Sequence, residues 1–303
     1  MSIILPFQDT PGQCLSIGPS QGIAYAIDKD IVLKVPFQFK VSPDTDLSHC
    51  WDLSIRSFIA MDREMAVYDA LQVQPHRNFA QRLGPSSTDF LFLERLDPLD
   101  KVWSLAGRAD QFRWALDLLD AASWLEKLGF VHGDVAVRNL GVDKVSTLKV
   151  FDFGSSSRFE SSVDIINDHF DLATCLHFIL SGVDPFAGVQ SHSEATQIRD
   201  TLKAGQWTIA EGAEVIGHVI QDGWTGRTGT RSFTGLFNQV TKILGATGLP
   251  LNSKVGKRDY YQLHLRCQNW LCNTPTNPLW KKPEEYIAAC KAVGYERDLD
   301  DWQ

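Results

Sequence analysis

Two short groups of polar residues in the middle of the chain carry the side chains best suited to chemistry. The tripeptide HGD at 132–134 is followed by Asn139, five residues after Asp134, and the apolar run LKVF at 148–151 leads directly into DFG at 152–154. Two carboxylates and a carboxamide therefore stand in loops at the ends of predicted strands. Hard oxygen ligands of this kind suit Mg²⁺, which proteins usually hold through few of their own ligands plus phosphate oxygens.

A lysine stands in the centre of an apolar strand nearer the N-terminus. Lys34 lies within the sequence VLKV at 32–35, a strand that is expected to bury both neighbours of the lysine. Because an unpaired buried charge is costly, this lysine needs a partner of opposite charge. Glu64 is the candidate, since it lies on a helix that the apolar spacing predicts over about 54–71.

The elements that position these residues follow from hydrophobic periodicity and from turn residues. The first hundred residues are rich in predicted strands, with two or three short strands over 15–36 and a buried strand at 90–93 (FLFL). The remainder is rich in predicted helices. An amphipathic helix is expected over 110–128, and a helix that is apolar nearly all round over 168–181. Further helices are predicted at 193–204, 211–221 and 232–244.

This order of elements predicts an α+β protein with two packed lobes of different class. A small, β-rich N-terminal lobe is expected over 1–95 and a larger helical lobe over 96–254. Residues 255–303 form a C-terminal extension with several aromatic side chains, and we expect it to pack on the larger lobe.

Composition excludes several classes of protein. The 303 residues carry a net charge of −8, which argues against a nucleic-acid binder that relies on a general basic surface. No run of 18 apolar residues predicts a membrane span, and the N-terminus lacks the positive region of a signal peptide. The six cysteines form no CxxC pair, so they are interpreted as reduced thiols rather than zinc ligands. A cytoplasmic or nuclear protein without nucleic-acid or membrane partners is expected.

Taken together, the motifs resemble those of the eukaryotic protein-kinase-like family, in the family's order, over about residues 15–245. The resemblance implies that Lys34 contacts nucleotide phosphates and that Glu64 holds this lysine. It implies that Asp134 is the catalytic-loop aspartate. It assigns Asn139 and Asp152 to the metal.

The same resemblance implies a nucleotide site for ATP, with Mg²⁺ as cofactor. Gly18 and Gly22 match the glycine loop over the phosphates. The segment LERL, which contains Glu94 and Leu96, matches the hinge that binds adenine through backbone groups. Arg138 stands as in the tyrosine-kinase form of the loop and is expected to serve the γ-phosphate.

Three features depart from the usual pattern of the family. The glycine loop at 18–22 has lost one glycine and is one residue shorter. Gly133 stands where most protein kinases have an arginine that reads a phosphorylated activation loop, so control of that kind is not expected. Thirteen residues separate Gly154 from Asp168, without an APE-like motif. The HGD catalytic loop and the shortened segment after DFG are similar to those of a group of fungal kinase-like proteins.

The resemblance implies an ATP-dependent phosphotransferase that moves the γ-phosphate to a hydroxyl, most simply on a protein serine, threonine or tyrosine. A small hydroxylated metabolite is the alternative acceptor, because HGD and the reduced activation segment are similar to those of aminoglycoside and choline kinases. A pseudokinase scaffold is a third hypothesis, motivated by the weak glycine loop and opposed by the retention of all five polar residues. His132 and Asp168 are expected to be structural, as a core histidine bonded to backbone and as a helix cap or loop tether.

Overall fold

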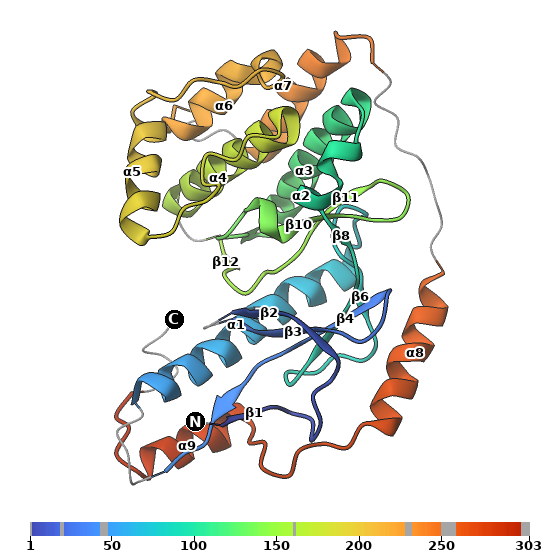
Figure 1. Cartoon of the computed structure of the whole chain (residues 1–303), viewed down its shortest axis with the longest axis vertical. Helices are drawn as coiled ribbons and strands as arrows, with labels where there is room; N and C mark the ends of the chain where they lie inside the picture. The colour runs from blue at the N-terminus through green and yellow to red at the C-terminus, as the bar shows by residue number, and fades with distance from the viewer. Residues whose placement is uncertain are drawn as a thin grey trace. The chain divides into compact units, whose positions relative to one another are not determined.

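The computed structural model describes residues 2–18, 21–42, 48–159, 162–227, 232–249 and 259–297. The chain divides into two compact units (Figure 1). The first contains residues 1–72, 81–95 and 257–303, and the second contains residues 73–80 and 96–256. Within the described ranges, no helix combines the length and the apolar character needed to cross a membrane.

The first unit is built on a five-stranded antiparallel sheet with strand order β2-β3-β4-β7-β6. Three of its strands lie between Gln13 and Val35, where two or three were predicted over 15–36. A long helix, α1 (Ser48–Val73), extends beyond the predicted range 54–71. The strands are β2 (Gln13–Gly18), β3 (Gly22–Ala26), β4 (Ile31–Val35), β6 (Arg82–Leu83) and β7 (Leu91–Glu94), beside the short pair β1 (Ile3–Ile4) and β5 (Gln38–Phe39).

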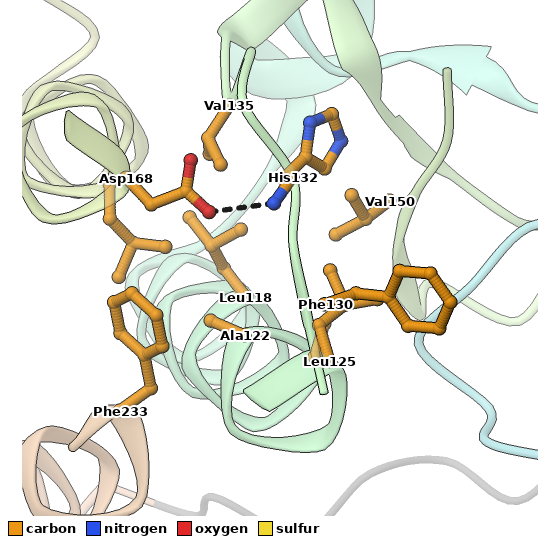
Figure 2. Close-up of a pocket in the computed structure, with 11 residues that line it drawn as sticks. Leu118, Ala122, Leu125, Phe130, His132, Val135, Val150, Asp168 and Phe233 are labelled. Carbon is orange, nitrogen blue, oxygen red and sulfur yellow. Dashed lines mark hydrogen bonds between the residues drawn. The ribbon is translucent and has the colours of Figure 1, made fainter. Parts of the chain in front are cut away.

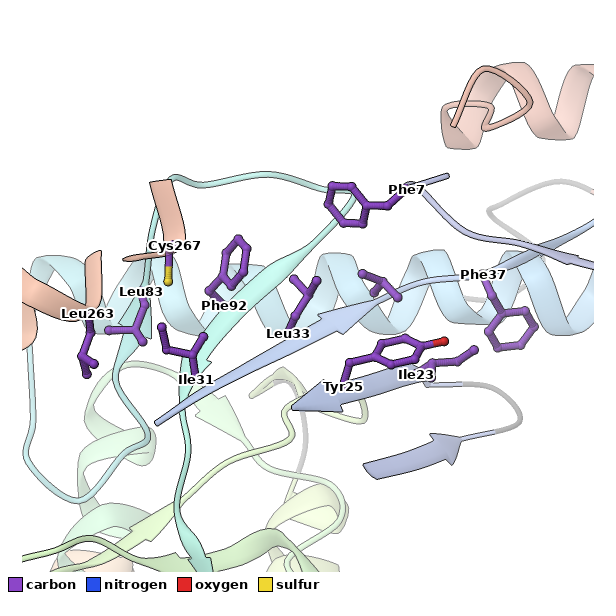
Figure 3. Close-up of a cluster of buried hydrophobic side chains, with 11 residues drawn as sticks. Phe7, Ile23, Tyr25, Ile31, Leu33, Phe37, Leu83, Phe92, Leu263 and Cys267 are labelled. Atoms are coloured by element: carbon purple, nitrogen blue, oxygen red, sulfur yellow. The ribbon is translucent and has the colours of Figure 1, made fainter. Parts of the chain in front are cut away.

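The side chains of β4 alternate between the two faces of this sheet. Successive side chains of a strand point to opposite faces, so Ile31, Leu33 and Val35 share one face, while Lys34 projects from the other. The first three are at most 1% exposed and belong to one apolar cluster, shown in Figure 3. Lys34 thus has an apolar layer directly behind it.

The C-terminal extension belongs to the first unit, so the expectation that it packs on the helical lobe is wrong for the described residues 259–297. Its helices are α8 (Tyr260–Asn273) and α9 (Pro283–Lys291). Leu263 and Cys267 of α8 enter the apolar cluster of the sheet (Figure 3). Aromatic and apolar content predicts that a segment is buried, but it does not identify the surface that buries it.

The second unit is mainly helical. The predicted amphipathic helix is α3 (Arg108–Lys127), and Gly129, with a φ of 78°, follows its end in the left-handed conformation that commonly terminates helices. The predicted buried helix is α4 (Ser162–Ser181), which begins six residues earlier than expected. The other elements are α2 (Leu99–Val102), the 3₁₀ turns η1 (Trp103–Leu105) and η3 (Glu214–Ile216), and the helices α5 (His192–Lys203), α6 (Gly217–Trp224) and α7 (Phe233–Gly245).

Two small sheets in the second unit support the loops that carry the polar motifs. The hairpin of β10 and β11 pairs Leu140 with Val150 and adds β8 at its other edge. Strand β9 pairs with β12 just after DFG. The strands are β8 (Asp97–Pro98), β9 (Phe130–Val131), β10 (Leu140–Val142), β11 (Leu148–Val150) and β12 (Ser157–Arg158), with the turn η2 (Val137–Asn139) before β10.

Candidate active site

The loop between β9 and β10 brings two predicted site residues, Arg138 and Asn139, to the carboxylate of a third, Asp134. Arg138 Nη2 donates to both Asp134 oxygens, at 2.6 Å to Oδ1 and 2.8 Å to Oδ2. Asn139 Nδ2 donates to the Asp134 carbonyl at 2.9 Å and to Oδ2 at 3.1 Å. The turn η2 brings the arginine and the asparagine back towards the aspartate, whose side chain is 24% exposed. Asp134 is therefore held in one orientation yet remains accessible.

Asp168 of α4 tethers the start of this loop. Its Oδ2 accepts a hydrogen bond from the backbone nitrogen of His132 at 2.7 Å, and its Oδ1 accepts one from Gly133 at 2.9 Å. Figure 2 shows this carboxylate directed at the His132 backbone, beside a small apolar cavity lined by side chains of α3. Hydrogen bonds to an ionised acceptor are stronger than neutral ones. The expected structural role of Asp168 is confirmed, as a loop tether.

His132 is a neutral structural residue. Its Nδ1 accepts from the backbone nitrogen of Asp134 at 3.3 Å, so its Nε2 carries the hydrogen directed at the Phe151 carbonyl, also at 3.3 Å. Burial lowers the pKa of this imidazole, although neighbouring carboxylates oppose the shift. The ring also contacts Phe153, the buried phenylalanine of DFG, at a centroid distance of 5.0 Å. The prediction of a core histidine bonded to backbone is confirmed.

Gly133 has a backbone reason to be glycine. Its φ is 74°, in the left-handed region that disfavours residues with a Cβ. A Cβ at this position would lie 2.3 Å from the carbonyl oxygen of Ser155. The chain after DFG therefore lies directly against the HGD loop, and this loop has no room for an arginine here in this backbone conformation.

The β10–β11 hairpin brings Asn139 and Asp152 to the same end of one small sheet. Asn139 precedes β10, and its carbonyl accepts from the backbone nitrogen of Phe151 at 3.1 Å, one residue before Asp152. The φ of Asp152 is 67°, a conformation that aspartate and asparagine tolerate better than most residues. This juxtaposition follows from antiparallel pairing, because the residues that flank a hairpin pair lie beside each other.

The donor set at this end of the hairpin fits a magnesium ion. Because the amide nitrogen of Asn139 donates to Asp134, its Oδ1 is the atom left to face a cation. Asp152 adds a carboxylate at the same end. In the described ranges no group of three or more His, Cys, Asp or Glu side chains could hold a metal by itself. One amide and one carboxylate match Mg²⁺ bound mainly through phosphate oxygens and water.

The predicted lysine–glutamate pair forms within the first unit. Lys34 Nζ lies 2.5 Å from Glu64 Oε2, and the two side chains are 10% and 0% exposed. Glu64 therefore supplies the negative charge that a buried Lys34 needs. That Lys34 contacts nucleotide phosphates stays a prediction.

The glycine loop contains one glycine that the backbone itself demands. Gly18 and Gly22 face each other at the end of the β2–β3 hairpin, and Pro19 and Ser20 lie outside the described residues. Gly22 has a φ of 99°, and a Cβ there would lie 2.6 Å from the Val35 carbonyl oxygen. A turn and a close approach of strands thus explain Gly22. The contact of both glycines with phosphates stays a prediction.

The side chains of the two predicted hinge residues are used inside the protein. Glu94 is 2% exposed, its Oε1 accepts from the Gln81 backbone nitrogen at 2.8 Å, and its Oε2 accepts from Tyr260 at 3.1 Å. Leu96, in the second unit, packs its Cβ against Gly141, where an added Cβ would lie 2.6 Å away. That this segment binds adenine through its backbone groups stays a prediction.

Asp171 is a partly buried carboxylate, 20% exposed at its side chain, near the HGD loop, and we did not predict it as a site residue. It lies three residues after Asp168 on α4, so both project from the same side of the helix. Burial raises its pKa from 3.8 to about 7, aided by the charges of Asp168 and Asp134 and opposed by Arg199, whose Nη2 lies 3.5 Å away. The spacing from Asp168 was the available signal for this residue.

The raised pKa of Asp171 predicts a pH-dependent stability. The folded protein keeps the proton up to about pH 7, whereas the unfolded chain loses it near pH 4, so stability from this group falls as pH rises between these values. Relative to Asp171→Asn, wild type is expected to lose about 2 kcal/mol of unfolding free energy between pH 5 and 7.5. Urea unfolding at several pH values measures this, with the exposed Asp200→Asn as control. Parallel pH profiles for wild type and Asp171→Asn would contradict it.

Comparison with known proteins agrees with this geometry. A family model described as protein tyrosine and serine/threonine kinase matches residues 97–212, which lie inside the second unit and include Asp134, Asn139 and Asp152. No curated protein matches the chain. Residues 97–212, less than half of the chain, are thus similar to the protein kinases, and the match supports a kinase-like phosphotransferase. With its strand-rich first unit and helical second unit, the chain has the α+β, bilobal protein-kinase-like fold that was expected.

Proposed function

We propose that the protein is an ATP- and Mg²⁺-dependent phosphotransferase that moves the γ-phosphate of ATP to a hydroxyl group, most simply on a protein. The observation that carries the proposal is the arrangement around Asp134. Arg138 and Asn139 hold its carboxylate by hydrogen bonds, and Asp152 follows the strand that pairs with the Asn139 segment. A general base, a cation for phosphate and two metal-ligand oxygens are thereby available in one small region.

In this proposal the four site residues of the second unit have three tasks. Asp134 orients the acceptor hydroxyl and takes its proton. Arg138, 68% exposed at its side chain, turns its guanidinium to the γ-phosphate. Asn139 and Asp152 hold Mg²⁺, which when bound neutralises charge on the phosphoryl group. The chain contributes positioning and fixed charge rather than covalent chemistry.

The first unit contributes nucleotide contacts in this proposal. Lys34, kept in place by Glu64, binds the α- and β-phosphates. Gly18 and Gly22 supply backbone at the phosphates. The backbone of the Glu94 segment binds adenine, together with that of Leu96. We also propose that the HGD loop and the short segment after DFG relate this protein to the fungal kinase-like proteins.

A catalytic role explains the buried pair better than a scaffold role does. Burying Lys34 and Glu64 costs desolvation that apolar residues of the same volume avoid, so such a pair is weak support for stability alone. A protein that only binds partners has no chemical need for the pair.

Thermal unfolding with ATP and Mg²⁺ tests nucleotide binding without knowledge of the acceptor. A ligand at a hundred times its dissociation constant stabilises the folded state by about 2.7 kcal/mol. We expect a Mg²⁺-dependent rise in melting temperature for wild type and its loss in Asp152→Asn. Asparagine also tolerates the φ of 67°, so this variant keeps the fold. The exposed Asp200→Asn is the control and should respond as wild type. The absence of any shift in folded wild type would refute the nucleotide site.

A small hydroxylated metabolite is the second candidate acceptor. The observation that favours it is the short chain after DFG, where β12 ends at Arg158 and α4 begins at Ser162. A peptide substrate needs an extended surface, and a small acceptor needs little beyond the loop around Asp134. Incubation with labelled ATP separates the two acceptors, because label appears either on protein or on a small molecule. In both cases the transfer should disappear in Asp134→Asn.

A further inference from the structure

The C-terminal segment 259–297 packs against both elements that carry the Lys34–Glu64 pair. We call it the C-terminal clamp. Its first helix, α8, lies on the sheet, and its second helix, α9, lies on α1. Both contacts lie within the first unit.

The α8 part of the clamp covers the sheet face opposite Lys34. Leu263 and Cys267 are at most 5% exposed and share one apolar cluster with the β4 side chains that flank the lysine (Figure 3). Polar contacts also anchor the helix to the turn before β4. Arg266 forms ion pairs with Asp28 and, at 3.0 Å, with Asp30, the turn residues before β4.

The α9 part of the clamp covers α1. Ile287 and Tyr286 lie in a buried cluster with Ile55 and Phe58 of α1, and the rings of Phe58 and Tyr286 are 5.6 Å apart. The Tyr286 hydroxyl donates to the Phe39 carbonyl at 2.8 Å and lies 3.1 Å from the hydroxyl of Ser54. One side chain of the clamp therefore joins α1 to the strand segment that follows β4.

The clamp and the ion pair lie on opposite sides of the same two elements. Nine residues separate Ile55 from Glu64, which is about two and a half helical turns, so the two side chains project from opposite faces of α1. Lys34 likewise projects away from the Leu33 face of β4 that α8 covers. The ion pair thus lies between β4 and α1, and the clamp packs on the opposite face of each of these two elements.

We propose that the C-terminal clamp is a positioning element that holds α1 against the sheet so that Glu64 pairs with Lys34. The consequence for catalysis rests on the proposed function, whereas the effect on the pair does not. The clamp supplies this positioning in cis, from the same chain. Ile287 and Tyr286 are its positioning residues.

Chemical labelling of Lys34 tests the clamp without any assay of activity. The variant is Ile287→Asp, which places a carboxylate in the buried cluster around Ile55, and the control is Leu279→Asp at a side chain that is 65% exposed. An amine-reactive acyl reagent followed by mass spectrometry measures the accessibility of Lys34. We expect the labelling rate to rise about tenfold in Ile287→Asp through local opening, and to stay unchanged in Leu279→Asp. Hydrogen exchange of α1 should accelerate in parallel.

Conservative variants separate positioning from general loss of structure. Ile287→Leu should restore slow labelling, and Tyr286→Phe, which keeps the ring and loses two hydroxyl contacts, should raise the rate by a smaller amount. If Ile287→Asp does not fold, Tyr286→Phe alone decides. The proposal is overturned if α9 loses its exchange protection while α1 exchange and Lys34 labelling stay as in wild type. Absence of nucleotide binding with the labelling result intact would refute the proposed function and leave the clamp standing.

Discussion

Asp134→Asn is expected to lower the rate constant of phosphoryl transfer by about 10³-fold or more, equivalent to about 4 kcal/mol of activation free energy. The carboxylate is lost as a proton acceptor. The new amide group also presents hydrogen-bond donors to Arg138 Nη2 and Asn139 Nδ2, which both donate to Asp134 in wild type. One substitution thus removes both the general base and the anionic partner of Arg138. Single-turnover transfer from labelled ATP measures the effect.

Controls separate this loss of chemistry from loss of structure. The Asp134 side chain is 24% exposed and lies in a loop, so the altered hydrogen bonds should lower the melting temperature by a few degrees only and leave the variant folded. The stabilisation by ATP and Mg²⁺ should also remain, because Asn139 and Asp152 are unchanged. A folded variant with undiminished transfer would show that Asp134 is not the base. A wild type that binds nucleotide and transfers phosphate to no acceptor would favour the scaffold alternative.

Gly133→Ala is expected to destabilise the second unit by about 3 kcal/mol, from about 1–2 kcal/mol for a left-handed alanine plus the cost of overpacking. The added Cβ would lie 2.3 Å from the Ser155 carbonyl oxygen, which is backbone and cannot rotate away. To relieve the overlap, the loop must move from Asp168, which binds the backbone nitrogens of His132 and Gly133. Urea unfolding of the purified variant measures the change.

Gly188→Ala is the matched control for this substitution. Gly188 has a similar φ of 77°, and no atom lies within 4 Å of its added Cβ. It should therefore show the conformational cost alone, about 1–2 kcal/mol. Equal destabilisation of the two variants would mean that the contact with Ser155 carries no energy. In that case the glycine of HGD would be explained by its φ and not by the chain after DFG.

Local sequence patterns were sufficient to predict the elements that carry the site. Apolar spacing predicts α1 and α3 because the apolar residues of a helix recur on its buried side. Both helices bury more than that side, including polar residues such as Ser54 of α1 and Gln111 of α3. The position of Lys34 in an apolar strand predicts a buried cation, and the requirement for charge neutralisation selects Glu64. The motifs HGD, Asn139 and DFG predict polar side chains in loops at strand ends, and the pairing of β10 with β11 brings Asn139 and Asp152 to one end of a hairpin.

The sequence by itself therefore determined the class of the fold, the main strands of the first hundred residues, the helices α1, α3 and α4, and which polar side chains were candidates for the site. The tertiary structure alone decided which surfaces meet. It placed α8 and α9 in the first unit, set the backbone of Ser155 against Gly133, and buried Asp171 enough to raise its pKa to about 7. The physical reason is that periodicity reports whether a face is buried, whereas the identity of the covering surface depends on contacts between residues far apart in the chain.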